Sequence, residues 1–296
     1  AVYGICGGCS FQHLSSENQI KAKQTWLQSA FMGQAKTEPK AWLDPLQVTS
    51  WGYRRKARLG VRYVHKKEKV LVGFRERKSS FITVMDRCEV LHPSLGDNLS
   101  VLGEYIGKLS VKSHIPQIEV AIAENDTVLI LRHLEPLTSE DEAVLRDCAE
   151  QLSITWYTQS GGMNTVKPLD SPVNLSYSLP EHNIEMVFLP TDFTQVNFEL
   201  NQKMMSLALS LLELNDEDKV IDLFCGLGNF TLPIARYAHS VVGVEGDGGL
   251  IERAKENAER NGIDNASFYK ADSFEDVSGL EWFRGQTYNK AIIDPA

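Results

Sequence analysis

A glycine-rich turn that follows an apolar segment is the part of this sequence with the clearest chemistry. It lies in residues 220–230, VIDLFCGLGNF. Glycines let the backbone approach a ligand closely, and the helix predicted to follow offers free N–H groups. Glu245 lies 23 residues after Asp222, at the end of a second apolar segment, where a carboxylate can reach the two hydroxyls of a ribose. The pattern predicts a nucleoside-cofactor site; the alternative is a plain strand–helix crossover.

The spacing of the glycines distinguishes between cofactors. Gly226 and Gly228 fill the first two positions of the dinucleotide pattern G-x-G-x-x-G, but the third position is Thr231. This argues against a pyrophosphate and against a nicotinamide-dependent dehydrogenase. The acidic Asp222 suits a ligand with a sulfonium and an amino group, as in S-adenosylmethionine. Asp272 follows the third predicted strand, where it could contact adenine or cap a helix.

The cysteines point to metal chemistry. Five cysteines in a chain too large to need disulfides favour a reducing compartment, the cytoplasm. Cys6 and Cys9 form a C-x2-C pair, which suits a metal, a cluster or a redox dithiol, and Cys88 is a candidate third ligand. Cys148 lies in an amphipathic helical pattern and Cys225 has no evident base nearby, so both are predicted to be packing residues.

Basic residues are concentrated in one stretch although the chain as a whole is acidic. The net charge is −9, but residues 51–78 hold 11 Lys and Arg against 2 acidic residues, a charge of +9 that leaves −18 elsewhere. Aromatic and basic residues interleave in 51–58, WGYRRKAR, which is typical of RNA binding. We predict RNA contacts from Arg54, Arg55, Lys56, Arg58 and Arg75; the alternative is a solvated edge strand.

The elements that must position these residues fall into two halves. In the first, helices are predicted over 15–31, 95–112 and 139–152, with Ser139 as the cap of the last, and strands over 58–64, 70–74, 81–86, 117–123 and 127–132. After a Gly- and Pro-containing connection at 160–185, helices over 201–214, 229–239 and 249–261 alternate with strands over 219–224, 241–245, 266–270 and 290–294. This alternation predicts a parallel, doubly wound α/β sheet.

Length and composition fit two domains without a membrane segment. The 296 residues are 43% hydrophobic, which is enough for two cores. No apolar run approaches the length of a membrane span, and the N-terminus does not have the pattern of a signal peptide. We expect an α+β domain over 1–180 and a cofactor-binding domain over 181–296.

Seven motifs together carry a resemblance to a known family. They are CGGC at 6–9, WGYRR at 51–55, GFR at 73–75, DFTQVN at 192–197, DLFCGLGNF at 222–230, EG at 245–246 and DPA at 294–296. The sequence resembles the bacterial RNA uracil-C5 methyltransferases, and most closely the iron–sulfur branch that modifies 23S ribosomal RNA. The resemblance implies a Rossmann-like S-adenosylmethionine-dependent methyltransferase domain, incomplete at its C-terminal end, after an iron–sulfur and RNA-binding α+β domain.

The resemblance also assigns ligands. It implies S-adenosylmethionine contacts from Gln195, Phe224, Asn229, Glu245, Asp272 and Asp294, although the family often has Asn in place of Asp272. It implies a [4Fe–4S] cluster held by Cys6, Cys9, Cys88 and a fourth cysteine that would immediately precede Ala1. The expected partner is 23S ribosomal RNA, and the expected state is a monomer that binds no membrane.

The resemblance implies covalent catalysis by residues outside these 296. In the family, a Cys thiolate adds to uracil C6, C5 takes the methyl group, and a carboxylate base removes the C5 proton. The nucleophile lies in a Ser-Cys-Asn-Pro segment after the DPA motif, and the base lies later still, so both are expected beyond Ala296. We therefore expect an inactive fragment of a methyltransferase, cut at both ends. The alternative function is a non-catalytic RNA-binding iron–sulfur module.

Overall fold

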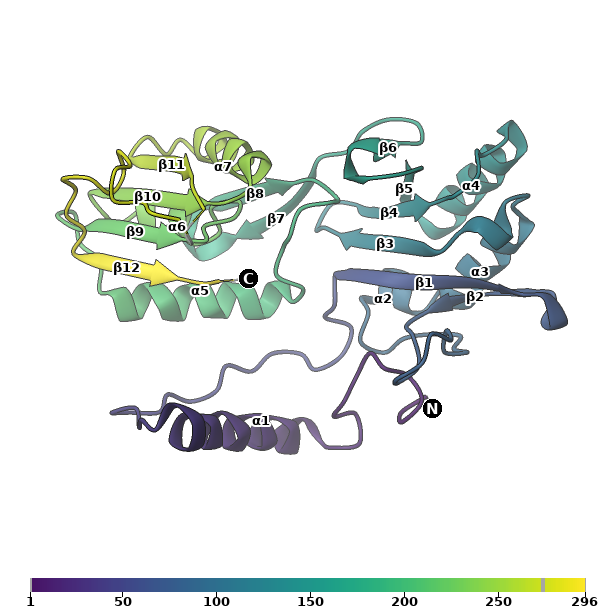
Figure 1. The fold of residues 1–296 in the computed structure, drawn as a ribbon, viewed down its shortest axis with the longest axis horizontal. Coiled ribbons are helices and arrows are strands. Elements are labelled where there is room, and N and C mark those ends of the chain that lie inside the picture. Colours follow the sequence, from purple (N-terminus) through teal and green to yellow (C-terminus); the bar gives the residue numbers. More distant parts are fainter. Residues whose placement is uncertain (1, 273–274, 296) are drawn as a thin grey trace. The chain divides into compact units, whose positions relative to one another are not determined.

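The structure is a computed structural model that describes residues 2–272 and 275–295 of the chain. The described residues form two compact units (Figure 1). The first unit spans 1–121 and 127–172, and the second spans 122–126 and 173–296. The short segment 122–126 thus belongs to the second unit although the sequence on both sides of it belongs to the first.

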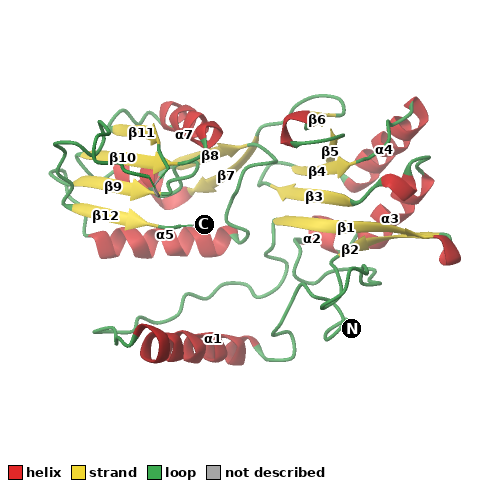
Figure 2. Ribbon diagram, in the orientation of Figure 1, coloured by secondary structure: helices red, strands yellow, loops and turns green. Residues whose placement is uncertain are grey.

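The first unit is built on a mixed six-stranded sheet (Figure 2). Its strand order is β2-β1-β3-β4-β5-β6, with β1 antiparallel to β2 and β3, and β4 parallel to β5. The strands are β1 Lys56–Val64, β2 Lys69–Gly73, β3 Gln117–Ile122, β4 Thr127–Arg132, β5 Thr155–Gln159 and β6 Lys167–Pro168. The helices are α1 Ser16–Ala30, α2 Pro93–Gly96, α3 Leu99–Lys108 and α4 Ser139–Leu152, with short turns at Phe31–Ala35, His65–Lys67, Lys112–His114 and Met163–Thr165.

Two of these helices differ sharply in how much they bury. Helix α3 contacts β2 and α4, and its Leu102 and Ile106 are fully buried, as an amphipathic pattern requires. Helix α1 begins where the sequence predicts, with the Ser15 side chain accepting a hydrogen bond from the Asn18 amide, but it buries no residue. Its Trp26 is 73% exposed. A helical pattern with apolar positions therefore does not by itself predict a buried face.

The predicted strand over 81–86 is wrong. The segment has only an isolated bridge, between Ile82 and Arg75, and the Ile82 and Met85 side chains lie against the strands β1 and β2. Gly60 and Gly73 lie opposite each other in β1 and β2 and make room for this segment. A Cβ on Gly60 would lie 2.3 Å from Ile82 Cδ1, and one on Gly73 would lie 3.3 Å from the Met85 sulfur.

The cap predicted for α4 is displaced by one residue. Thr138, not Ser139, is the N-cap: its hydroxyl accepts a hydrogen bond from the Asp141 amide, and the Asp141 carboxylate accepts one from the Thr138 amide. The same carboxylate accepts hydrogen bonds from the Ser110 amide at 2.6 Å and the Ser110 hydroxyl at 2.7 Å. Asp141 therefore fastens the start of α4 to the end of α3.

The second unit confirms the predicted doubly wound sheet. Its strands β9 Lys219–Leu223, β10 Ser240–Glu245, β11 Ala266–Lys270 and β12 Lys290–Ile293 are all parallel, in the order β11-β10-β9-β12. Its helices are α5 Phe198–Leu212, α6 Thr231–Ala235 and α7 Gly248–Arg260. The core includes Val220, Val244 and Ala254, none of which has exposed surface. A short turn at Pro180–His182 joins the two strands of a separate hairpin, β7 Leu175–Leu179 and β8 Ile184–Phe188.

Two details of the second unit differ from the sequence prediction. The hairpin β7–β8 occupies part of the expected connection at 160–185, and its buried residues alternate with partly exposed ones, as in a half-buried hairpin. Helix α6 is shorter than the predicted 229–239. It ends early because Arg236 and Tyr237 donate to Pro233 and Ile234, three residues back, so the last turn tightens.

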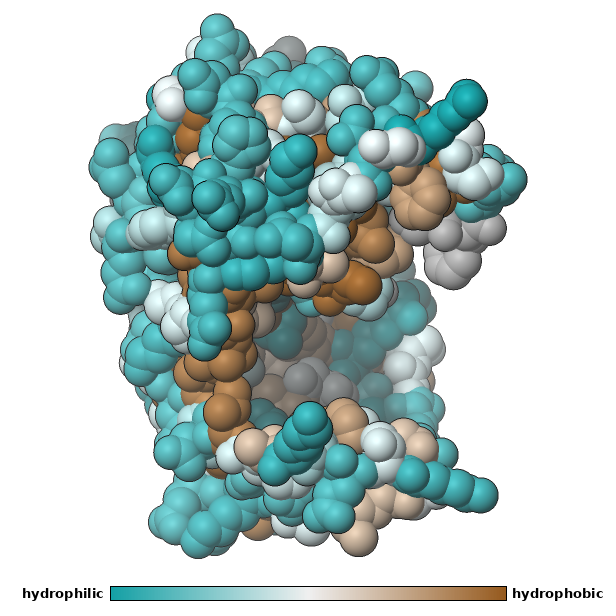
Figure 3. Space-filling view, turned by 90° about the vertical axis from the view of Figure 1, so that its left-hand side faces the viewer, coloured by the Kyte–Doolittle hydropathy of each residue, from teal (hydrophilic) through white to brown (hydrophobic). Residues whose placement is uncertain are grey.

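No helix among the residues that the structure describes has both the length and the apolar character needed to cross a bilayer. On the face shown in Figure 3, hydrophilic residues predominate and apolar residues reach the surface in a smaller area.

The Asp141 contacts predict a pH-dependent contribution to stability. Burial acts to raise the pKa of Asp141, but the hydrogen bonds from Ser110 and Thr138 outweigh it, so the pKa lies below its ordinary value of 3.8. The ionised form is therefore bound more strongly in the folded state. Asp141→Ala should lower the free energy of unfolding by about 3 kcal/mol at neutral pH, measured by urea denaturation.

This loss should shrink as the pH falls through the lowered pKa, because protonation removes the same interaction from the wild type. Glu140→Ala is the matched control: Glu140 also lies in the first turn of α4 but is exposed, so its loss should cost less than about 0.5 kcal/mol. Equal effects of the two substitutions would contradict the role assigned to Asp141.

Candidate cofactor and cysteine sites

The turn from β9 into α6 is made by residues in the left-handed region of backbone conformation. Phe224, Gly226 and Gly228 have φ values of 65°, 55° and 89°. Glycine adopts this conformation at little cost, but phenylalanine does not. The carbonyl oxygen of Val244 in β10 holds Phe224 there, because it accepts hydrogen bonds from the amides of Phe224 at 2.8 Å and Cys225 at 3.1 Å.

Glu245 closes the other side of the turn. One carboxylate oxygen accepts a hydrogen bond from the Gly226 amide at 3.2 Å, and the other accepts from the amides of Gly246 at 2.7 Å and Asp247 at 3.1 Å. The predicted ribose-binding carboxylate is thus already oriented by three backbone amides. Its geometry joins the glycine turn to the end of β10, so the two predicted cofactor segments lie side by side.

Asp222 is the most strongly perturbed acid of this site. It has no exposed surface, and the hydroxyl of Thr231 donates to its Oδ2 at 2.5 Å while its Oδ1 has no hydrogen-bond partner among the described residues. Burial is the main reason that the pKa of Asp222 rises to about 7; the Thr231 hydrogen bonds oppose this rise, and the nearby carboxylates of Asp294 and Glu245 add to it. Three acids therefore lie close to one another at the glycine turn.

Two other predicted cofactor residues lie at the same edge of the sheet. Asp272 follows β11, where the Ala271 amide donates to the Glu245 carbonyl. Asp294 follows β12, and its amide donates to the Leu223 carbonyl at 3.4 Å. Both side chains are exposed. Because the carboxyl ends of adjacent parallel strands meet at one edge, these residues join Phe224 and Glu245 around the turn.

The DPA motif that begins at Asp294 ends at Ala296, which lies outside the described residues. The same holds for Ala1, before which the fourth cluster cysteine is expected. The nucleophile and the base are expected beyond Ala296, so no described residue tests them, and they stay predictions.

Asn229 contacts α5, and Gln195 lies in the segment that precedes this helix. Gln195 is half-buried in the segment before α5, and Asn197 caps that helix by accepting a hydrogen bond from the Leu200 amide. Asn229 makes a reciprocal amide pair with Asn201 of α5, with both hydrogen bonds at 3.0 Å. The sequence analysis missed Asn201, although a polar residue on the buried side of an apolar helix was the signal that could have revealed it.

The turn has the features that a nucleoside cofactor with a cationic group requires. A Cβ on Gly226 would meet nothing within 4 Å, so the backbone there is open to a ligand. The buried, unpaired Oδ1 of Asp222 and the carboxylates around it favour a positive charge nearby. Both observations fit S-adenosylmethionine better than a pyrophosphate, which is anionic.

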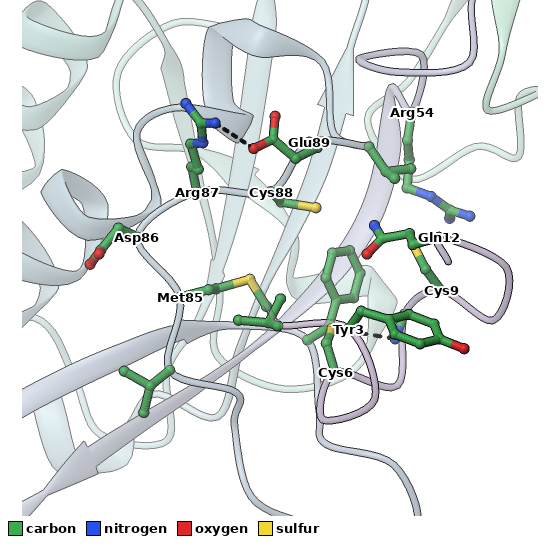
Figure 4. Close-up of a pocket in the computed structure, with 15 residues that line it drawn as sticks. Tyr3, Cys6, Cys9, Gln12, Arg54, Met85, Asp86, Arg87, Cys88 and Glu89 are labelled. Carbon is green, nitrogen blue, oxygen red and sulfur yellow. Dashed lines mark hydrogen bonds and ion pairs between the residues drawn. The ribbon is translucent and has the colours of Figure 1, made fainter. Parts of the chain in front are cut away.

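The first unit brings three predicted cysteines to one pocket (Figure 4). Cys6, Cys9 and Cys88 line a cavity of about 430 Å³. Burial raises the pKa of Cys9, and the neighbouring thiols of Cys88 and Cys6 raise it further. In the part of the chain that the structure describes, no three potential ligands lie close enough to hold a single metal ion. Cys148 and Cys225 are buried, as predicted for packing residues.

The N-terminal loop that carries Cys6 and Cys9 is fixed by backbone contacts. The Gly7 amide donates to the Arg75 carbonyl at 2.8 Å, and the Arg77 amide donates to the Ile5 carbonyl at 2.8 Å. The Arg77 side chain also donates to the Cys9 carbonyl at 2.8 Å. The loop is thereby held beside the segment that follows β2.

The predicted RNA-binding residues do not form one uniform surface. Arg54 lines the cysteine pocket, where Figure 4 shows it beside Gln12 and Cys9. Arg55 and Lys56 are half-buried. Arg58 is exposed but paired with Glu119 at 3.0 Å. Arg75 is exposed and lines an open hollow of about 920 Å³ together with Arg77, Lys78, Ser79 and Ser80.

The fold and the site together define the class of protein. A parallel sheet with a glycine turn after one strand and an acid at the end of the next is the arrangement of the Rossmann-like methyltransferases. The fold is similar to that of Pyrococcus abyssi tRNA (uracil-54, C5)-methyltransferase, solved with S-adenosyl-L-homocysteine: the TM-score is 0.71, with 20% identity, over 99% of this chain and 70% of that one.

Sequence comparison identifies the family. The chain belongs to the tRNA (Uracil-5-)-methyltransferase family, whose profile matches residues 15–285. It is 67% identical over 295 residues to the 23S rRNA (uracil(1939)-C(5))-methyltransferase RlmD of Vesicomyosocius okutanii, covering 100% of this chain and 67% of that protein. It is 47% identical over 301 residues to the enzyme of the same name from Francisella tularensis subsp. novicida, covering 99% and 67%. The chain thus spans about two thirds of the length of these relatives.

The raised pKa of Asp222 predicts that this residue destabilises the protein above neutral pH. Between the ordinary pKa of 3.8 and about 7, Asp222 holds a proton only in the folded state, so the free energy of unfolding falls as the pH rises through this interval. Asp222→Asn removes this titration. Relative to the wild type, the variant should become more stable between about pH 4 and pH 7 and keep that advantage above it.

Urea denaturation of both proteins at about pH 5 and about pH 8 measures this difference. Asp216→Asn is the control because Asp216 is an exposed acid just before β9, and this variant should follow the wild type at both pH values. A constant difference between Asp222→Asn and the wild type would show that Asp222 is ionised throughout.

Proposed function

We propose that the protein methylates C5 of a uridine in 23S ribosomal RNA and takes the methyl group from S-adenosylmethionine. The observation that carries this proposal is the glycine turn held between Val244 and Glu245, with Asp222 buried behind it. The names of the relatives, with 67% and 47% identity, support ribosomal RNA as the substrate. A ribosomal substrate would also place the protein in the cytoplasm.

The two units would divide the work. The second unit would bind S-adenosylmethionine through Gln195, Phe224, Asn229, Glu245, Asp272 and Asp294. The first unit would bind RNA, with the exposed Arg75 and its basic neighbours Arg77 and Lys78 on phosphates. The bound cofactor would supply an electrophilic methyl group, and the carboxylates of this chain would favour its cationic part.

The chemistry that this family resemblance implies is nucleophilic catalysis. A thiolate adds to C6 of the uracil, and the electron pair moved to C5 takes the methyl group while S-adenosylhomocysteine leaves. A base then removes the C5 proton, and the thiolate is expelled as the C5–C6 double bond re-forms. The target base must be unstacked for C6 to be reached.

We propose that none of the five cysteines is that nucleophile. Burial raises the pKa of Cys148 to about 12 and raises that of Cys225 too, and Asp222 and Glu245 raise the latter further. Cys6, Cys9 and Cys88 line the pocket of the first unit. We propose that the nucleophile and the base are supplied by residues outside these 296.

The 296-residue chain should therefore bind ribosomal RNA and S-adenosylhomocysteine without turning over. The measurement combines filter binding of a 23S RNA fragment, calorimetric titration with S-adenosylhomocysteine, and transfer of a labelled methyl group to the RNA. Turnover would place the nucleophile among the five cysteines. RNA binding without any binding of S-adenosylhomocysteine would instead support the RNA-binding iron–sulfur module.

We further propose that the cysteine pocket holds the iron–sulfur cluster. Cluster iron prefers thiolate ligands, and a cluster several ångströms across keeps its thiolates further apart than a single ion does. Cys6, Cys9 and Cys88 would hold it, with a fourth ligand from outside the pocket residues, and Arg54 would offset part of its negative charge. Methyl transfer moves no net electrons, so the cluster would serve structure or RNA orientation.

Anaerobic reconstitution with iron and sulfide tests this assignment. The wild type should gain iron and a visible charge-transfer absorbance, and Cys9→Ser should lose most of both because a cluster ligand is missing. Cys148→Ala is the matched control, since Cys148 is buried in α4 away from the pocket residues, and it should load like the wild type. Equal iron content in Cys9→Ser would overturn the assignment.

A further inference from the structure

A buried polar network fixes the side chain at the end of the glycine turn. The hydroxyl of Tyr177 in β7 donates to Asn229 Oδ1 at 2.8 Å, and Asn201 Nδ2 in α5 donates to the same oxygen at 3.0 Å. Asn229 Nδ2 donates in return to Asn201 Oδ1 at 3.0 Å. Tyr177 and Asn201 are 3% and 2% exposed, whereas Asn229 is buried to a lesser degree in the turn. The network therefore runs from the interior of the second unit to the turn.

The network determines what Asn229 can offer to a ligand. A carboxamide has two N–H donors and an oxygen that accepts two hydrogen bonds. Tyr177 and Asn201 use both acceptor sites of the Asn229 oxygen, and Asn201 uses one of its two donors. Asn229 is left with one side-chain N–H in a fixed orientation. An amide that rotates freely would offer the ligand either its acceptor oxygen or its donor nitrogen.

The network also ties the turn to the segment that carries Gln195. Asn201 lies in the first half of α5, which Asn197 caps shortly after Gln195. Upstream of Gln195, Asp192 is buried in a salt bridge with Arg253 of α7 and accepts a hydrogen bond from the Leu189 amide. The segment before α5 is thus fixed at both ends, by Asp192 on one side and by the α5–Asn229 contact on the other.

The hydroxyl of Tyr177 and its ring have separate contacts in the second unit, since the hydroxyl binds Asn229 and the ring packs against aromatic residues. The Tyr177 ring packs against Phe198, with centroids 4.9 Å apart, and against Phe188 at 5.9 Å. Burial raises the pKa of its hydroxyl well above the ordinary value, so it remains a donor. A phenylalanine would make the same ring contacts at this position and would lose only the hydrogen bond to Asn229.

We infer that Tyr177 and Asn201 are positioning residues for S-adenosylmethionine: they orient the Asn229 amide and align the Gln195 segment with the glycine turn. This inference rests on the proposed function, because it takes the turn as the cofactor site. Neither residue belongs to the glycine turn or to the set of predicted cofactor contacts. They act on the cofactor through Asn229, and their loss weakens binding without removing a contact to the ligand.

Calorimetric titration of the 296-residue chain with S-adenosylhomocysteine tests the inference. Tyr177→Phe removes a single hydroxyl and should raise Kd about threefold to tenfold, the effect of one hydrogen bond. Asn201→Leu removes two of the three hydrogen bonds that hold the Asn229 amide and should raise Kd about tenfold or more. The melting temperature of each variant is measured in parallel, and titrations are made well below the lowest of them.

Asn257→Leu separates positioning from general loss of stability. Asn257 is 1% exposed and exchanges two hydrogen bonds with the backbone of Val187 in β8, at 2.9 and 3.0 Å. This control removes a buried amide of the same kind from the same unit but leaves the glycine turn alone. It should lower the melting temperature at least as much as Asn201→Leu and leave Kd within about twofold of the wild type.

A double-mutant cycle tests whether Tyr177 acts through Asn229. In the Asn229→Ala background, Tyr177→Phe should change Kd by less than about twofold, because the group that it orients is gone. Additive effects of the two substitutions, or unchanged Kd in Tyr177→Phe and Asn201→Leu while the wild type binds, would overturn the inference. Absence of binding in the wild type itself would instead overturn the proposed function.

Discussion

The two hydrogen bonds that the Val244 carbonyl accepts from Phe224 and Cys225 are the constraint on which the cofactor site depends. They hold a non-glycine residue in the left-handed region, a conformation that costs about 1–3 kcal/mol. That conformation reverses the chain immediately after β9. As a result, the Gly226 amide meets the Glu245 carboxylate, and α6 starts where Thr231 can donate to Asp222. Part of the backbone strain of the second unit thus lies in the turn that would face the cofactor.

Both candidate sites gather acidic groups whose ionised forms a cationic ligand would stabilise. Behind the turn, Asp294 and Glu245 add to the burial that raises the pKa of Asp222. In the first unit, Cys88 and Cys6 add to the burial that raises the pKa of Cys9. At the turn, this lowers the stability of the free protein above about pH 4, because folding disfavours the ionised form of Asp222. In the cysteine pocket, it lowers the tendency of Cys9 to form the thiolate that iron binds. A sulfonium cofactor in one case and iron in the other would favour the ionised forms.

The sequence predicted the parallel sheet of the second unit to within one or two residues, because short buried apolar runs that alternate with helical patterns are typical of parallel strands. It also located the turn and the ends of the strands that surround it. It could not reveal the Asn201–Asn229 pair, since that contact joins residues on α5 and the turn that only tertiary structure brings together. The segment 81–86 shows a second failure: its pattern predicts a strand, but Ile82 packs over Gly60 and only an isolated bridge joins it to Arg75. Local pattern does not by itself fix which residues are buried, because Phe81 is 71% exposed and α1 buries no residue.

The basic stretch shows why charge counted along a sequence overstates a binding surface. A net charge of +9 over residues 51–78 suggests a continuous electrostatic face for RNA. In the folded unit, Glu119 neutralises part of this charge at Arg58, and Arg54 lies in the cysteine pocket. The exposed charge near Arg75 lies on the segment that also fixes the cysteine loop, through Gly7 and Arg77. A cluster bound to the cysteine loop would therefore be connected to Arg75 and Arg77 by a few hydrogen bonds, which would couple the proposed iron–sulfur site to the proposed RNA surface.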